Sequence, residues 1–353
     1  MENKLKINLL NLSFITIKLL VTFLLISLII LLLGGSPLEV MESIIYGAFG
    51  KPQKIVKTLL IWAPIALASL ALLITFSAGL WNIGIEGQII AGSIGATIIA
   101  RSALGESIAS PYIQIFIGLI FGGLWGLLCG FLRVKFNVHE IFGGLGLDFV
   151  ASGLIVYLII GPWKRAGIAS TGGTDIFDKS SWVPTIGSSN FPLFLLIIIL
   201  FLYISSALLI KYSSIGIRLK ATGINIFATE RFYFTSDKYI ILSYLLAGGI
   251  AGIAGFSQSS AAYHKLVPSI SGGFGFLSIL IVLICSRNIY FSFIVSFLFS
   301  ALIVGGSQLQ IRMGLDHSII GIIQATFVLS WLVLQKLELE KIITKQITKV
   351  FTR

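Results

Sequence analysis

The sequence predicts an all-α membrane protein with about ten transmembrane helices. Of its 353 residues 56% are hydrophobic, whereas Asp, Glu, Lys and Arg together make up 11%. Soluble domains carry about 25% charged residues, so this chain has too little polar surface to cover a water-exposed globule. Its apolar runs are continuous, as in 193–202, whereas the strands of a closed barrel alternate apolar and polar residues. The composition excludes a cytosolic enzyme, a secreted domain and a disordered regulator.

Each predicted span is an apolar run bounded by polar, proline or glycine residues, because crossing the hydrocarbon core takes about 20 apolar residues. The first run follows three lysines and imitates a secretory signal, but the membrane character of the remaining chain favours an uncleaved span. The spans are expected at 15–34, 58–77, 85–101, 112–132, 139–161, 191–210, 239–258, 270–286, 290–306 and 315–335. Little chain remains for a soluble domain, so we expect residues 1–353 to form a single polytopic transmembrane domain.

The distribution of Lys and Arg sets the orientation of these spans. With the amino terminus inside, 16 of the 25 Lys and Arg residues fall in cytoplasmic segments, where such residues collect. The net charge of +11 therefore indicates membrane orientation rather than a nucleic-acid partner. Both termini are expected in the cytoplasm, with an outer loop at about 162–190, a cytoplasmic loop at about 211–238 and a cytoplasmic tail at about 336–353.

The two long loops each have two interpretations. The outer loop contains Trp163 and Trp182, whose rings suit either the membrane interface or a docking surface for a partner outside the cell. The cytoplasmic loop holds five basic residues. Those residues are either a topology signal or part of a lever that contacts a soluble partner.

Polar chemistry enters the membrane at residues 79–88, GLWNIGIEGQ, which place an acid, two amides and three glycines between two apolar spans. An unbroken helix is not expected here, and broken helices at membrane depth are tolerated only where they are buried or line a cavity. Asn82, Glu86 and Gln88 are therefore candidates for a substrate pathway. The alternative is structural, because Glu86 and Asn82 can bond the backbone amides freed by the break.

A second break is predicted at 268–276, PSISGGFGF, and precedes the eighth span as the first break precedes the third. Corresponding breaks in two halves indicate a central pathway. Asp148 lies about two turns into the fifth span and should face the bundle interior, since an isolated carboxylate in lipid is costly. Gln258 in the seventh span can bond a polar solute or a neighbouring helix, and the glycines at 248, 249, 252 and 255 favour close helix packing.

No catalytic or metal-binding set is recognisable. His139, His264 and His317 lack ligand spacing, so we expect no metal site. The chain has no Gly-rich phosphate loop and no nucleophile elbow, and its two cysteines lie in apolar runs. We therefore expect a non-catalytic chain that binds no cofactor itself.

At 81–88 the sequence resembles the permease subunits of bacterial ABC importers for nucleosides and simple sugars, the ribose-type family. The family pattern is Phe-Asn-Ile-Gly-x-Glu-Gly-Gln, and this chain has Trp81 in place of the Phe. The similarity continues through 138–141, VHEI, and through 221–225, ATGIN, and covers about 15–335. One departure is Asp148, where the family has an asparagine, and it bears on substrate preference if this residue lines the pathway.

The resemblance implies a type II ABC importer permease in the bacterial inner membrane. Its implied partners are a cytoplasmic ATPase with two nucleotide-binding domains that uses ATP and Mg²⁺, a second permease subunit, a substrate-binding lipoprotein outside the cell, and membrane lipid. It also implies a coupling helix at 221–232 seated in the ATPase. The candidate coupling residues are Gly223, Asn225, Ala228, Glu230 and Arg231.

The leading hypothesis is thus a permease subunit that translocates nucleosides or a related ribosyl or sugar compound into the cytoplasm. The rival hypothesis is an ion-coupled secondary transporter that uses Glu86 and Asp148 as proton or cation sites. The sequence does not distinguish nucleoside, ribose, galactose and riboflavin as substrates. It also leaves open whether the second permease is a copy or a paralogue.

Overall fold

The computed structural model describes residues 2–165, 172–225, 235–314, 316 and 318–336. This part of the chain is dominated by helices, and its one β feature is an isolated bridge between Ile186 and Phe191. The predicted all-α class is confirmed. The chain divides into two compact units, one within residues 52–300 and one within residues 1–51 and 301–353.

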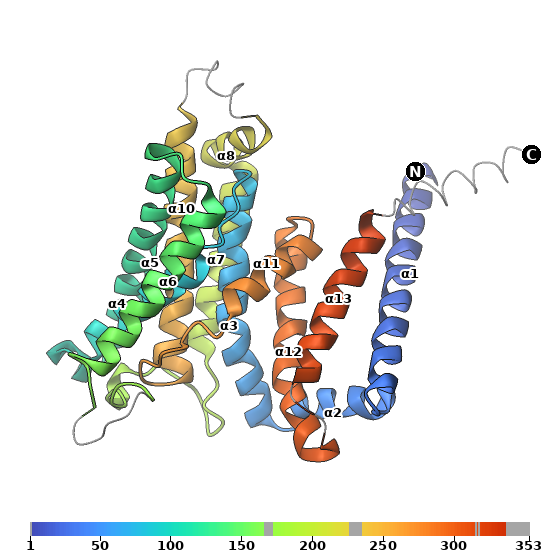
Figure 1. Cartoon of the computed structure of the whole chain (residues 1–353), viewed down its shortest axis with the longest axis horizontal. Helices are drawn as coiled ribbons and strands as arrows, with labels where there is room; N and C mark the ends of the chain where they lie inside the picture. Colours follow the sequence, from blue (N-terminus) through green and yellow to red (C-terminus); the bar gives the residue numbers. More distant parts are fainter. Residues whose placement is uncertain (1, 166–171, 226–234, 315, 317, 337–353) are drawn as a thin grey trace, which may run out of the picture. The chain divides into compact units, whose positions relative to one another are not determined.

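The larger unit is a helical bundle (Figure 1). Its helices are α3 (Pro52–Ser77), α4 (Ile85–Ala100), α5 (Ser110–Lys135), α6 (Glu140–Ile160), α7 (Leu193–Tyr212), α8 (Ser214–Ile224), α10 (Ser236–Ser257), α11 (Phe274–Ile284) and the beginning of α12 (Ile289–Met313). Two short 3-10 turns, Ala103–Glu106 and Lys179–Ser181, and a π-helix, Gln258–Ala262, lie in the connections. Residues at the helix termini favour these boundaries. In α5, for example, Pro111 lies in the first turn and the basic residue Arg133 lies in the last turn.

Helices α3 and α10 form the centre of this unit, and α4 and α5 pack against α10. The packing is a seam of glycines, in which Gly252 of α10 meets Gly92 of α4 on one side and Gly118 and Gly122 of α5 on the other. A Cβ atom at Gly252 would overlap the backbone of α5. The glycine spacing of α10 therefore allows the close backbone contact that small residues permit between membrane helices.

The outer helices of this unit bond to α3 through side chains. Tyr203 of α7 donates to the carbonyl of Ala66 at 3.0 Å, and Ser278 of α11 donates to the carbonyl of Ile65 at 3.1 Å. Trp62 of α3 donates from its indole Nε1 to Oγ of Ser296 in α12 at 3.0 Å. These bonds attach the outer helices to α3 and give polar groups of Tyr203 and Trp62 partners in an apolar interior.

The smaller unit contains α1 (Glu2–Leu32), α2 (Pro37–Phe49), the end of α12 and α13 (Ser318–Lys336). α1 and α2 are bent by 103° at the connection between them. An apolar cluster that includes Ile30, Val40, Leu309 and Ile320 joins these four helices. The sequence analysis missed α2, which begins with Pro37 after Ser36 and carries Glu39 in its first turn.

Each of the ten predicted spans contains a helix, but the count of ten transmembrane helices is not confirmed. In the described residues seven helices are long and apolar enough to cross a membrane, or eight if the bent pair α1 and α2 forms one span. The shorter apolar helices α4 and α11 have 16 and 11 residues. α4 begins at the first predicted break and α11 at the second, so the chain forms short helices at the two places where the sequence predicts a break.

Candidate functional site

The first break, residues 78–84, joins the end of α3 to the beginning of α4 and is held by a pair of amides. Asn82 Nδ2 donates to Gln88 Oε1 at 3.1 Å, and Gln88 Nε2 donates to Asn82 Oδ1 at 3.0 Å. Both side chains are buried. Each amide supplies the hydrogen-bond partner that the other needs in an apolar interior. The pair also fixes the break against the first turn of α4.

Asp148 of α6 caps the amino terminus of α4. Its Oδ1 accepts a hydrogen bond from the backbone N–H of Gly87 at 2.7 Å, although the two residues lie 61 positions apart in the sequence. A carboxylate at this position is favoured by the free N–H groups and the positive end of the helix dipole. Oδ2 has no hydrogen-bond partner among the described residues, and neither has the nearby indole Nε1 of Trp125.

Gly87 is glycine because the cap leaves no room for a side chain. A Cβ atom there would lie 2.8 Å from Asp148 Oδ1 and 2.7 Å from Trp125 Nε1. The glycine thus lets α6 and α5 approach the first turn of α4 at the level of the carboxylate. Sequence reasoning did not identify Trp125, because nothing in its own segment signals a polar neighbour.

Glu86 plays the same part for the second short helix. Its Oε1 accepts from the backbone N–H of Phe276, in the first turn of α11, at 3.1 Å, and the two residues are 190 positions apart. A Cβ atom at Gly275 would lie 2.8 Å from the same oxygen. The two buried carboxylates therefore each stand at the amino terminus of one short helix, and Glu86 itself lies in the helix that Asp148 caps.

Four of the five candidate pathway residues thus lie together around the first turn of α4, whereas Gln258 is placed elsewhere. Gln258 opens the π-helix after α10, where Gly255 packs against Ile89 and Ser93 of α4. Its side chain is fully buried, and neither Nε2 nor Oε1 has a hydrogen-bond partner among the described residues. An unpaired buried amide costs about 1–3 kcal/mol, so it marks a strained or functional position.

The coupling candidates are described only in part. Gly223 lies in α8, and Asn225 follows that helix with an extended backbone (φ −158°, ψ 106°), so the helix predicted at 221–232 is interrupted at Asn225. Ala228, Glu230 and Arg231 lie outside the described residues. Gly223 packs against the first break, since a Cβ atom on it would lie 2.7 Å from the amide nitrogen of Gly79. Figure 1 shows α8 at the end of the larger unit where α3 ends and α10 begins.

At the other end of the larger unit, residues 174–183 are bonded to the π-helix and to the chain that follows it. The backbone N–H groups of Thr174, Phe177 and Val183 donate to the carbonyls of Leu266, His264 and Ser260 respectively, at 2.8–3.1 Å. Gln114 of α5 bonds to the carbonyl of Ser181 at 3.0 Å and accepts from Ser260 at 2.5 Å. The predicted outer loop is therefore fixed to α5 and to the segment that leads into α11.

Within the described residues no group of three or more His, Cys, Asp or Glu side chains is placed to hold a metal ion. The chemistry of the site is that of neutral amides and two carboxylates directed at helix amino termini. Such an arrangement orients half-helices and binds polar groups through hydrogen bonds. It offers no pairing of a nucleophile with a base.

Comparison with known proteins agrees with the ribose-type resemblance. Residues 54–332 match the family model described as the permease component of the branched-chain amino acid transport system. The guanosine ABC transporter permease protein of Bacillus subtilis is 25% identical over 86% of this chain and 88% of its own length. The nucleoside ABC transporter permease protein of Lactococcus lactis is 24% identical over 87% of this chain and 86% of its own length.

A glucose ABC transporter permease protein of Haloferax volcanii is 25% identical over 80% of this chain and 75% of its own length. The relatives are permease subunits, and this similarity favours a permease component over the ion-coupled alternative. The family match covers most of the larger unit and extends through α12 into α13. The chain belongs to this family of multi-pass membrane permease components.

Proposed function

We propose that the chain is the permease subunit of an ATP-driven importer for nucleosides or related ribosyl compounds. The observation that carries the proposal is the alignment with the guanosine and nucleoside permeases over 86% or more of each chain. The glucose permease relative supports a simple sugar as the second candidate, over a smaller share of both chains. Both substrate classes are neutral and rich in hydroxyl groups, so either suits a pathway of amides.

The partners follow from this assignment. The chain lacks a phosphate loop, so a cytoplasmic ATPase with two nucleotide-binding domains supplies the free energy through ATP and Mg²⁺. A second permease subunit completes the pathway, and a substrate-binding lipoprotein delivers the solute from outside. The positive charge of the 211–238 loop supports a cytoplasmic position for this loop and for both termini.

The geometry supports this arrangement. The first break contacts α8, so a movement of the coupling loop reaches the amino terminus of α4 directly. From there Glu86 connects α4 to α11. A partner that binds the two conformations of this assembly with different affinity shifts their populations by that difference.

Purification from the native membrane tests the proposal. The tagged chain is extracted in mild detergent, and co-purifying proteins are identified by mass spectrometry, with an unrelated tagged polytopic protein as the control. The expected result is a two-domain ATPase, a second permease and a lipid-anchored binding protein, which is then screened against nucleosides, sugars and riboflavin. A chain that purifies alone under conditions that keep other importers assembled contradicts the proposal.

A further inference from the structure

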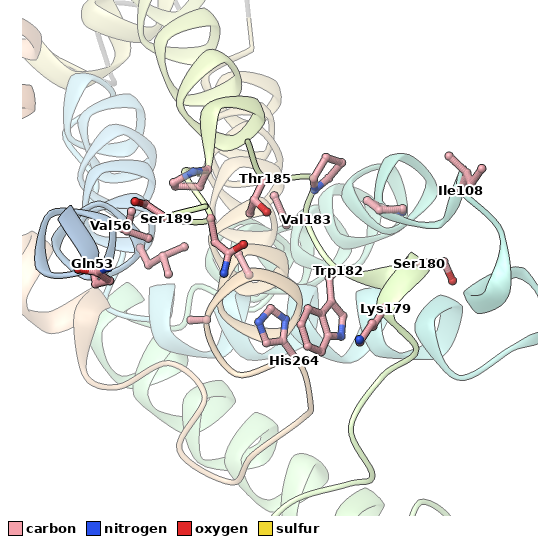
Figure 2. Close-up of a pocket in the computed structure, with 17 residues that line it drawn as sticks. Gln53, Val56, Ile108, Lys179, Ser180, Trp182, Val183, Thr185, Ser189 and His264 are labelled. Carbon is pink, nitrogen blue, oxygen red and sulfur yellow. The ribbon is translucent and has the colours of Figure 1, made fainter. Parts of the chain in front are cut away.

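A cavity of about 560 Å³ opens at the end of the larger unit where the loop 174–183 is bonded to the π-helix. Its walls come from the beginning of α3, from the loop 179–190 and from the π-helix, which contributes Ala261 and Ala262. Cavities of about 300–1,000 Å³ are typical of small-molecule sites. Figure 2 shows Gln53 and Ser189 across the cavity from Trp182 and Lys179.

One wall of this cavity carries an aromatic platform made of two rings that are stacked face to face, Trp182 and His264. The rings of Trp182 and His264 stack with centroids 3.8 Å apart and an angle of 15° between their planes. Each ring is fixed by a second bond, from Trp182 Nε1 to the carbonyl of Phe177 at 3.0 Å and from His264 Nδ1 to the carbonyl of Ser260 at 3.0 Å. The platform is therefore held in place before any ligand binds, which lowers the entropic cost of binding.

The other walls mix apolar and polar residues and are nearly uncharged. Gln53, Thr185, Ser189 and Asn190 line them with amides and hydroxyls. Burial lowers the pKa of His264 below its usual value, so its ring is neutral near pH 7 and Nε2 is a hydrogen-bond acceptor. Lys179 is then the only lining residue with a formal charge. This set of groups fits a neutral ligand that has hydroxyl groups and a flat ring.

The π-helix that lines the cavity also carries the unpaired amide described above. Ala261 and Ala262 belong to the same π-helix as Gln258, which comes about one turn earlier in the chain and is fully buried without a partner among the described residues. π-helical turns are rare and are frequent at functional sites. The amide is thus an unpaired polar group on the helix that lines the cavity.

We propose that this cavity is a solute-binding site on the outer face of the permease, which holds a nucleoside with its base stacked on the outer face of the Trp182–His264 pair and its ribose hydroxyls on the facing amides and hydroxyls. The inference rests on the proposed function for its substrate class and orientation. It adds a site within a single permease subunit, formed by the chain's own loop, α3 and π-helix. Gln258, in the same π-helix, is a further polar group that we assign to the solute pathway.

Equilibrium binding of radiolabelled guanosine to the purified importer in lipid nanodiscs tests the site, without ATP and without the binding protein. Replacement of Trp182 by Ala removes the platform and is expected to weaken guanosine binding about ten-fold. Thr185→Trp is the second variant, because Thr185 lines the cavity from an exposed loop position, where a larger side chain occupies the space of the ligand. Tyr112→Ala is the control, since this exposed aromatic residue at the beginning of α5 does not line the cavity.

Saturable guanosine binding that both cavity variants weaken and Tyr112→Ala leaves unchanged supports the site. Guanosine binding that neither variant alters overturns it. Uptake into proteoliposomes with ATP and the binding protein is measured on the same protein. Guanosine uptake without detectable binding to the cavity overturns the site alone, whereas absence of nucleoside uptake together with glucose uptake overturns the proposed nucleoside specificity.

Discussion

At the scale of single residues, the two buried carboxylates act on helix termini. Asp148 accepts from Gly87 at the beginning of α4, and Glu86 accepts from Phe276 at the beginning of α11. A carboxylate in an apolar interior is expensive unless it is hydrogen-bonded, and a helix amino terminus supplies both N–H donors and a favourable dipole. This role accounts for the acids without requiring that either one titrates during transport.

Substitution of Asp148 distinguishes a structural role at the helix terminus from a role that needs the negative charge. Asparagine keeps the oxygen that accepts the hydrogen bond but carries no charge. We expect Asp148→Asn to retain uptake and thermal stability, since the side-chain oxygen still accepts from Gly87. Asp148→Ala leaves that buried N–H unpaired and should cost about 1–3 kcal/mol of stability, seen as a lower unfolding temperature in detergent. Loss of uptake in a stable Asp148→Asn protein would instead show that the charge itself is needed.

Amide and alanine variants of Glu86 test the corresponding bond at the amino terminus of α11. Glu86→Gln preserves an oxygen for the Phe276 N–H and should leave uptake within a few-fold of the unmodified protein. Glu86→Ala removes that oxygen and should cost about 1–3 kcal/mol of stability, seen as a lower unfolding temperature. Equal stability of the Gln and Ala variants would mean that the bond to α11 does not hold the helix.

At the scale of elements, the glycines of α10 differ in how closely neighbouring helices approach them. Gly252 touches the backbones of α4 and α5, whereas a Cβ atom at Gly249 would lie 3.4 Å from Leu119 Cγ, an ordinary contact distance. The two positions lie on the same helix and differ in what surrounds them. They therefore form a matched pair for testing how tightly α10 is packed.

Gly252→Ala should destabilise the protein by about 1–3 kcal/mol or more, because the added methyl group forces backbones apart. Gly249→Ala should be neutral or slightly stabilising, since alanine is the better helix former by about 1 kcal/mol. Thermal unfolding and membrane levels of the two variants provide the comparison. Similar losses in both would contradict the glycine seam.

The loop after α8 carries the coupling prediction. Asn225→Ala or Glu230→Ala should lower uptake about ten-fold while ATP hydrolysis continues, because the lever no longer transmits the ATPase cycle to the first break. Lys220→Ala, on the exposed face of α8, is the matched control. Unchanged uptake at normal membrane levels of the two variants would remove the coupling assignment.

The sequence predicted most of the elements because long apolar runs and glycine-rich breaks are local signals. It did not indicate that two of the expected spans hold helices of only 11 and 16 residues, because such an apolar run resembles a longer span until its neighbours are known. It missed α2, whose 13 residues include acids and a proline. The partners of Asp148 and Glu86 could not be predicted either, since their bonds join positions 61 and 190 residues apart.

At the scale of the whole molecule, the candidate site joins the two long loops of the larger unit. The loop 174–183 is bonded to the segment that leads into α11, α11 is bonded to Glu86, and the first break contacts Gly223 of α8. The outer and cytoplasmic segments predicted from charge are thus connected through the two short helices. Such a connection is what a permease needs if events at the ATPase are to open a pathway on the other side.

The most direct test of the central claim is guanosine uptake by proteoliposomes that contain the co-purified importer with its binding protein. The account predicts uptake that requires ATP and the binding protein and persists when an ionophore collapses ion gradients. Uptake that survives without ATP but disappears with the ionophore would contradict it and identify the chain as an ion-coupled transporter.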